Sequence, residues 1–206
     1  MARKLIVMNN LIIVGSSGHG NVVAEIAIQS GYTVKFWDDD SSKINHEHKI
    51  EKRDLVIPAN TNIFVAIGAN KIRELISLQY PQESFIFLFH PQSSISNNAK
   101  IGVGTVVMSG VVVNYGVHVG DHCILNSGAI IDHDCTLEEY VHVSPNATLC
   151  GNVSVGTGTW IGAGATIIQG INIGKNVTIG AGAVIINDVP NNATVVGNPG
   201  KVIKYS

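Results

Sequence analysis

Residues 155–185 read VGTGTWIGAGATIIQGINIGKNVTIGAGAVI, and an aliphatic residue returns at every sixth position of this stretch. The same spacing continues without a slip from Ile95 to Pro190, and the fourth residue after each aliphatic position is mostly small or β-branched. A short fixed period of this kind predicts a parallel β-solenoid of hexapeptides, in which each unit buries its apolar residue by stacking on neighbouring turns. The aliphatic positions are Ile95, Ile101, Val107, Val113, Val119, Leu125, Ile131, Leu137, Val143, Leu149, Val155, Ile161, Ile167, Ile173, Ile179 and Ile185.

No other regular structure accounts for this spacing. An α-helix would repeat its apolar positions about every 3.6 residues, and hairpins would need turn signals between alternating runs. Three hexapeptides are expected to form one triangular turn, so that residues eighteen apart stack on adjacent coils with strands about 4.8 Å apart.

The composition limits the classes of function. The 206 residues suffice for one large or two small domains, and a net charge of −2 gives no support for nucleic-acid binding. No apolar run approaches the roughly 20 residues that span a bilayer, so no membrane insertion is expected. Arg3 and Lys4 are not followed by a long apolar region or a cleavage motif, which argues against a signal peptide. Three cysteines without zinc-site spacing favour a reduced, cytoplasmic setting.

The first ninety residues alternate between predicted strands and helix. A buried strand leads into Gly15-Ser-Ser-Gly-His-Gly20, a helix follows, and the next strand runs into Asp38 and Asp39. This order is typical of a nucleotide-binding βαβ unit. The expected strands are Leu11–Val14, Thr33–Trp37, Asn62–Ile67 and Phe85–Phe89, and the expected helix is Asn21–Ser30.

The glycine loop has three interpretations, because its spacing is G-x-x-G-x-G rather than G-x-G-x-x-G. It could bind a dinucleotide, with Asp38 on the ribose hydroxyls, although the expected sheet is small for that. It could hold a single nucleotide or nucleotide-sugar through N–H groups at the helix start. It could also be a plain turn, with Asp38 and Asp39 a solvated strand end, but His19 between two glycines is unusual for a connector.

One coil of the predicted solenoid, residues 125–142, concentrates polar side chains. His133 lies between two aspartates and is the candidate general base, because an imidazole titrates near neutral pH and a carboxylate can fix its tautomer. Neighbouring side chains on a strand point to opposite faces, but a corner breaks this alternation and would let Asp134 orient the ring. The alternative is an ordinary surface histidine. The polar residues are Asn126, Asp132, His133, Asp134, Glu138, Glu139 and His142.

A zinc site is the competing interpretation, since four histidines are available. Zinc needs three of them to converge, and no pair is separated by a multiple of eighteen residues. We therefore predict no metal. The four are His118, His122, His133 and His142.

The chain as a whole resembles the nucleotide-sugar branch of the hexapeptide acyltransferases, the sialic-acid-type and bacillosamine-type acetyltransferases. Ser17-Gly-His-Gly20, Trp37-Asp-Asp39, Ala66-Ile-Gly68 with Ile72-Arg73, and Ile131-Asp-His-Asp-Cys135 match that branch in order, and the ending from Asp188 to Val202 looks like the closing segment of coenzyme A-dependent members. The resemblance implies a small Rossmann-like nucleotide-sugar domain (residues 1–91), a left-handed parallel β-helix (92–190) and a closing segment (191–206).

The resemblance also implies roles for individual residues. His133 would be the catalytic base, and Asp134 would raise its basicity. Ser17, Gly18, His19, Asp38, Asp39 and Gly68 would bind the UDP-sugar. His142, Gly151, Ala163 and Ala181 would lie along acetyl-CoA. Relatives are homotrimers with sites between subunits.

Three functions follow as expectations. The first is N-acetylation of the 4-amino group of a UDP-4-amino-4,6-dideoxy-N-acetylhexosamine by direct attack on acetyl-CoA. The second is O-acetylation of sialic acid or a related sugar hydroxyl, which would use the same residues. The third is a non-catalytic trimer that binds a nucleotide-sugar and regulates a partner enzyme.

Overall fold

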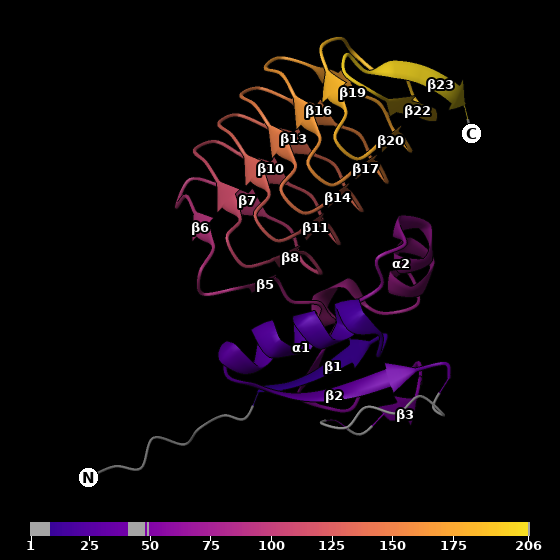
Figure 1. The fold of residues 1–206 in the computed structure, drawn as a ribbon. Helices are drawn as coiled ribbons and strands as arrows, with labels where there is room; N and C mark the ends of the chain where they lie inside the picture. Colours follow the sequence, from indigo (N-terminus) through magenta and orange to yellow (C-terminus); the bar gives the residue numbers. More distant parts are fainter. Residues whose placement is uncertain (1–8, 41–47, 49, 206) are drawn as a thin grey trace.

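The computed structural model describes residues 9–40, 48 and 50–205, so Arg3, Lys4 and the start of the chain lie outside the described residues. The N-terminal part is a parallel four-stranded sheet of order β3-β2-β1-β4, and α1 (Gly18–Gln29) packs on it (Figure 1). Its strands are β1 (Asn9–Val14), β2 (Tyr32–Asp38), β3 (Ile50–Lys52) and β4 (Thr61–Val65). A second helix, α2 (Asn70–Ser77), and the 3₁₀ turn η1 (Gln82–Ser84) lead to the solenoid.

Helix α1 begins at Gly18, three residues before the expected start at Asn21. Half of the glycine motif is therefore helix rather than loop. Gly15 has a φ of 106°, a conformation that glycine adopts without strain, and a Cβ at Gly20 would lie 2.0 Å from the Gly15 carbonyl oxygen. These two glycines let the chain turn sharply from β1 into the helix.

The expected strand Phe85–Phe89 was wrong as a member of the N-terminal sheet. Phe85 contacts that sheet only through an isolated bridge to Ile63, whereas β5 (Leu88–Phe89) pairs with β8 in the solenoid. The fourth strand of the sheet is β3, which is too short for its alternation to stand out in the sequence.

The hexapeptide region forms a three-sided parallel solenoid, as its period predicted (Figure 1). Ile124 pairs with Val106 on one side and with His142 on the other, so residues eighteen apart are neighbours. The first side holds β5, β8 (Val106–Val107), β11 (Ile124–Leu125), β14 (His142–Val143), β17 (Trp160–Ile161) and β20 (Thr178–Ile179). The second holds β6 (Ser94–Ile95), β9 (Val112–Val113), β12 (Ile130–Ile131), β15 (Thr148–Leu149), β18 (Thr166–Ile167) and β21 (Val184–Ile185). The third holds β7 (Lys100–Ile101), β10 (His118–Val119), β13 (Thr136–Leu137), β16 (Ser154–Val155) and β19 (Asn172–Ile173).

The two ends of the solenoid differ from its regular coils. Because Phe89 precedes Ile95 by six residues and already pairs with Val107, the ladder starts one hexapeptide earlier than the sequence suggested. At the other end β22 (Ala193–Val196) pairs with β20, and β23 (Lys201–Tyr205) folds back antiparallel to it.

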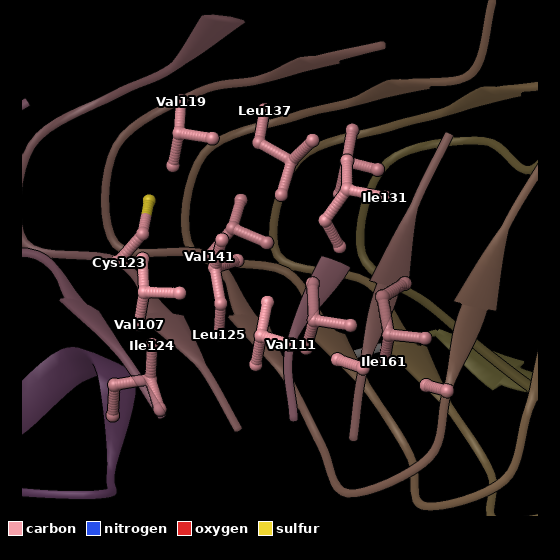
Figure 2. Packing of buried hydrophobic residues seen from close by; sticks show 14 of the residues in the cluster. Val107, Val111, Val119, Cys123, Ile124, Leu125, Ile131, Leu137, Val141 and Ile161 are labelled. Atoms are coloured by element: carbon pink, nitrogen blue, oxygen red, sulfur yellow. The ribbon is translucent and has the colours of Figure 1, made fainter. Parts of the chain in front are cut away.

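The aliphatic positions fill the interior of the solenoid. All sixteen are buried except Ile95 and Ile101, which are half-buried near the open first coils. Figure 2 shows Val119 and Leu137, which pair on adjacent coils, and Ile131 from another side of the solenoid directed into this interior. Cys123 and Cys135 are fully buried, and burial raises the pKa of their thiols to about 12 and about 11.

Each corner of the solenoid requires one residue with left-handed backbone geometry. This residue recurs every sixth position from Gly104 to Gly182, and Gly or Asn occupies most of these positions, as expected for φ values near +60°. The exceptions are His122, Asp134 and Tyr140, with φ values of 56°, 59° and 59°.

Candidate active site

His133 lies at the corner between β12 and β13, where the left-handed backbone of Asp134 turns that carboxylate back toward the ring. His133 Nδ1 is 2.9 Å from Asp134 Oδ2, and both side chains are 59% exposed. On the other side, Asp132 Oδ1 accepts a hydrogen bond from the His133 backbone N–H at 2.8 Å. The corner thus brings together the two side chains that the sequence places side by side.

This arrangement sets the charge and the orientation of the imidazole. The hydrogen bond to Asp134 raises the pKa of His133 above its usual value, and the negative charge of Asp132 adds to the effect. Because the carboxylate can only accept, Nδ1 carries the proton and the lone pair of Nε2 faces outward. Such an imidazole can take a proton from a bound substrate.

Gly151 lies one coil beyond His133, and the imidazole covers it. A Cβ at Gly151 would lie 2.6 Å from both Cε1 and Nε2 of His133, so only glycine leaves room for the ring in this position. The Gly151 N–H has no hydrogen-bond acceptor among the described residues. The imidazole of His133 and the backbone of Gly151 border an open hollow of about 520 Å³. The hollow is lined by Asp132, His133, Cys150, Gly151, Asn152, Gln169 and Gly170.

A second cavity, of about 140 Å³, opens at the carboxyl ends of β1, β2 and β4. In open α/β sheets, ligands bind outside this edge. Four of the six residues expected to bind the nucleotide-sugar line it, together with Arg53. The lining residues are Val14, Gly15, Ser17, Asp38, Asp39, Arg53, Ile67, Gly68 and Ile76.

Two glycines beside this cavity are not explained by the packing of the chain. A Cβ at Gly18 or Gly68 would meet no atom within 4 Å, and neither residue has a positive φ. Their missing side chains leave space into which a ligand can approach the backbone closely.

The two aspartates of the cavity differ in environment. Asp38 is buried, and its Oδ2 accepts hydrogen bonds from the Ser16 backbone N–H at 2.9 Å and from the Ser16 hydroxyl at 2.8 Å. The side chain of Asp39 is 70% exposed and pairs with Arg53 at 2.8 Å, which raises the pKa of Arg53. Sequence reasoning missed Ser16 and Arg53. Arg53 lies in an irregular connection without a motif, so nothing in the pattern singles it out.

His19 and His142 do not border either cavity; they lie between the N-terminal sheet and the solenoid. His19 Nε2 is buried without a hydrogen-bond partner among the described residues. Burial and then the charge of Arg73 lower its pKa to about 4. For His142 on β14, burial, Arg73 and then His19 lower the pKa to about 4. His142 Nε2 is 3.2 Å from Asn126 Nδ2, and its ring stacks on Trp160 with centroids 6.0 Å apart.

Ala163 and Ala181 are exposed on a different corner from His133. The Gly182 N–H donates to the Ala163 carbonyl at 2.8 Å, so these alanines stack on successive coils of the corner between β17 and β18. This corner borders the side of the solenoid that carries His142. Within one chain, the predicted acetyl-CoA residues therefore occupy two corners and one side.

The His133 corner and the N-terminal cavity are also separate within one chain. Helix α2 contacts the corner that precedes β11, β14 and β17, where Asn70 Nδ2 donates a hydrogen bond to the Gly158 carbonyl at 2.9 Å. His133 lies on a different corner of the three-sided coil, the one between β12 and β13.

Residues 9–40, 48 and 50–205 contain no group of three or more His, Cys, Asp or Glu side chains placed to hold a metal ion. None of the helices within the same ranges is long and apolar enough to cross a membrane.

Comparison with known proteins places these features in a family. The PglD N-terminal domain model matches residues 10–79, and the bacterial transferase hexapeptide model of six repeats matches residues 152–187. The acetyltransferase domain of PglB from Neisseria gonorrhoeae FA1090, solved with acetyl coenzyme A, is 39% identical with a TM-score of 0.90 over 95% of this chain and 100% of that chain.

Two other relatives carry printed substrate names. A histidine-to-asparagine variant of perosamine N-acetyltransferase from Caulobacter crescentus, solved with CoA and GDP-perosamine, is 32% identical with a TM-score of 0.90 over 95% of this chain and 97% of that chain. UDP-N-acetylbacillosamine N-acetyltransferase of Bacillus subtilis (strain 168) is 36% identical over 114 residues, which is 50% of this chain and 52% of the relative. The chain thus aligns with about half the length of this curated relative.

These matches agree with the sheet and the solenoid described above. The fold is an N-terminal Rossmann-like α/β unit followed by a left-handed parallel β-helix. The chain belongs to the hexapeptide-repeat sugar N-acetyltransferases, in which a PglD-type N-terminal domain precedes the β-helix.

Proposed function

We propose that this protein transfers the acetyl group of acetyl-CoA to the 4-amino group of a UDP-4-amino-4,6-dideoxy-N-acetylhexosamine. The observation that carries the proposal is the His133–Asp134 pair, with 2.9 Å between Nδ1 and Oδ2, beside Gly151 in an open hollow. Relatives named for bacillosamine and perosamine N-acetylation support an amine acceptor.

The reaction proceeds by direct transfer. The lone pair of the sugar amine attacks the thioester carbonyl while His133 Nε2 takes the proton of the amine. The tetrahedral intermediate then collapses, the C–S bond breaks, and the coenzyme A thiolate leaves with a proton returned from His133. The free N–H of Gly151 faces the oxyanion, and such donors typically contribute about 3–4 kcal/mol. Cys135 takes no part, because it is buried and its pKa is raised to about 11.

In this proposal, each of three consecutive parts of the chain has its own role. Residues 1–91 hold the nucleotide-sugar, residues 92–190 supply the acetyl-transfer site, and residues 191–206 close the solenoid. Ser17, Gly18, His19, Asp38, Asp39 and Gly68 bind the nucleotide-sugar. His142, Gly151, Ala163 and Ala181 bind acetyl-CoA.

The assembly in this proposal is a homotrimer with its sites between subunits. It is supported by the separation of the His133 corner from the N-terminal cavity in one chain. A neighbouring solenoid can bring its own His133 to the sugar that this chain holds.

The test measures thiol release from acetyl-CoA with UDP-4-amino-4,6-dideoxy-N-acetylglucosamine. His133→Ala is expected to lower kcat roughly 10²–10⁴-fold. His118→Ala, which removes an exposed histidine from the same solenoid, is the matched control and keeps the parent rate.

Equal release by His133→Ala and the parent would remove His133 from the mechanism. Turnover of sialic acid but not of the amine, with a product labile to mild base, would establish O-acetylation instead. Nucleotide-sugar binding without thiol release across a broad acceptor panel would indicate a non-catalytic trimer.

A further inference from the structure

Arg73 on α2 is the largest fully buried side chain, with 1% of its surface exposed. Every guanidinium donor of this residue is used. Nε donates to the His122 carbonyl at 2.8 Å, and Nη1 donates to the carbonyls of Ile67 and Gly68 at 2.8 and 3.2 Å. Nη2 donates to Asn70 Oδ1 at 2.8 Å and to the Tyr140 carbonyl at 3.0 Å.

The five acceptors belong to two different parts of the molecule. Ile67, Gly68 and Asn70 form the turn between β4 and α2, and Gly68 lines the N-terminal cavity. His122 and Tyr140 are left-handed corner residues of adjacent solenoid coils. One side chain therefore fixes the rim of the nucleotide cavity to the wall of the solenoid.

No carboxylate in the described part of the chain forms an ion pair with Arg73, so its positive charge is balanced only by carbonyl and amide oxygens. An unpaired buried charge is costly and persists only where geometry fully satisfies it. A guanidinium has five N–H donors in a fixed plane, whereas a lysine ammonium has three donors at one point and cannot replace this set of bonds.

We infer that Arg73 is a positioning residue for acetyl transfer: it holds the Ile67–Asn70 turn, and with it the nucleotide-sugar cavity, in register with the solenoid side that carries His142. This inference rests on the proposed function, because it assumes that the cavity presents a sugar to that wall. Burial lowers the pKa of Arg73 to about 10, so its charge persists at neutral pH.

The same charge acts on the two histidines in this gap. The titratable groups that face His142 are Arg73 from α2 and His19 from α1, and the charge of Arg73 lowers the pKa of both histidines. The positioning of the turn by Arg73 and the effect of its charge can therefore be tested separately. Arg73→Lys keeps the positive charge but loses the planar set of five N–H donors. Arg73→Met loses both the charge and the donors. Lys71→Met removes a cation from the exposed side of the same helix, where its partner is Glu74, and serves as the control.

The experiment combines three measurements on the full chain. The first is the affinity for UDP, GDP and CoA by calorimetry, and the second is hydrogen exchange over residues 67–77. The third is the pKa of His19 and His142 by NMR. We expect both Arg73 variants to bind the nucleotide about ten- to a hundredfold more weakly than the parent, with faster exchange in the turn, while affinity for CoA stays within about twofold. Only Arg73→Met is expected to raise the pKa of the two histidines.

Parent-like nucleotide affinity and parent-like exchange in both Arg73 variants would overturn the inference. If neither variant folds, Asn70→Ser carries the test, because it removes one of the five acceptors and leaves the guanidinium in place. Asn70→Asp keeps that acceptor oxygen and loses only the Nδ2 hydrogen bonds to the Gly158 and Thr159 carbonyls, so it controls for those bonds. Asn70→Ser should show smaller losses in the same direction, and parent-like values there would also overturn the inference. If the parent acetylates no amino sugar, the proposed function fails, but the exchange and NMR data still decide whether Arg73 holds the turn.

Discussion

Asp134 faces His133 because a corner of the solenoid needs a residue with positive φ, and aspartate tolerates that geometry better than most. The corner that terminates one strand thus also builds the pair that supports general-base catalysis. Sequence adjacency suggested this partnership, since a corner interrupts the alternation of a strand. The same reasoning could not find Ser16 or Arg53, because their contacts with Asp38 and Asp39 depend on how separate segments of the N-terminal sheet meet.

The charge of Asp134 should be visible in the pH dependence of catalysis. A general base must be unprotonated, so the acidic limb of the kcat/KM profile follows the pKa of His133, which Asp134 raises. Asp134→Asn keeps an oxygen acceptor but removes the charge, so the limb should move to lower pH and the plateau should fall. Glu139→Gln, an exposed acid on another corner, should leave the profile in place. An unmoved limb in Asp134→Asn would contradict the assigned pairing.

At the scale of the element, the hexapeptide period alone predicted the solenoid, its stacking distance of eighteen residues and its interior. Every hexapeptide adopts the same strand-and-corner structure, so an atypical residue at one position does not change the structure predicted for the other hexapeptides. The prediction failed at the ends of elements. The ladder began one hexapeptide early at Phe89, and β3 was missed, because two- and three-residue strands carry little periodicity of their own. Which sheet Phe85–Phe89 would join depended on long-range pairing that no local pattern contains.

The buried histidine at the His122 corner predicts that the free energy of unfolding decreases in acid. The His122 ring is buried between Phe85 and Tyr140, with centroid distances of 4.5 and 5.3 Å, and burial and then Arg73 lower its pKa to about 4 from a normal 6.5. Between these two pH values the unfolded chain binds a proton that the folded chain does not, so the free energy of unfolding falls as pH decreases from about 6.5 to about 4.

Substitution of His122 by asparagine tests this linkage, because asparagine suits the local φ of 56°. His122→Asn should lower the melting temperature at pH 7 by leaving a cavity, and should show a smaller further drop between pH 7 and pH 5 than the parent. His19 and His142 contribute in the same direction and form a common background in both proteins. Thermal unfolding at fixed protein concentration, with His118→Asn as the exposed control, measures the difference. Parallel curves for parent and variant would contradict it.

At the scale of the whole molecule, the candidate site residues divide between separate parts of one chain. Helix α2, which follows the rim of the N-terminal cavity, contacts the corner that precedes β11, β14 and β17, whereas His133 lies on the corner between β12 and β13. Sequence reasoning from residues alone could not show this separation; the expectation of sites between subunits came only from the family resemblance.

A mixing experiment tests whether the site is shared between chains. Gly68→Trp fills the nucleotide cavity, His133→Ala removes the base, and each variant alone should be inactive. In trimers assembled from equal amounts of both, roughly a quarter of the interfaces would pair an intact cavity with an intact histidine and regain activity. Absence of recovery in mixed assemblies, verified by mass, would place each complete site within one chain.

The uninterrupted eighteen-residue register also constrains how the gene can change in length. Loss or gain of a single codon within the solenoid would turn every later aliphatic residue out of the interior, so such alleles should be eliminated even when the reading frame survives. Duplication or loss of eighteen codons would preserve every stacking contact except those at the junction. The length of this region should therefore drift over evolutionary time in whole coils, and a lineage that gained one would lengthen the solenoid without altering its cross-section.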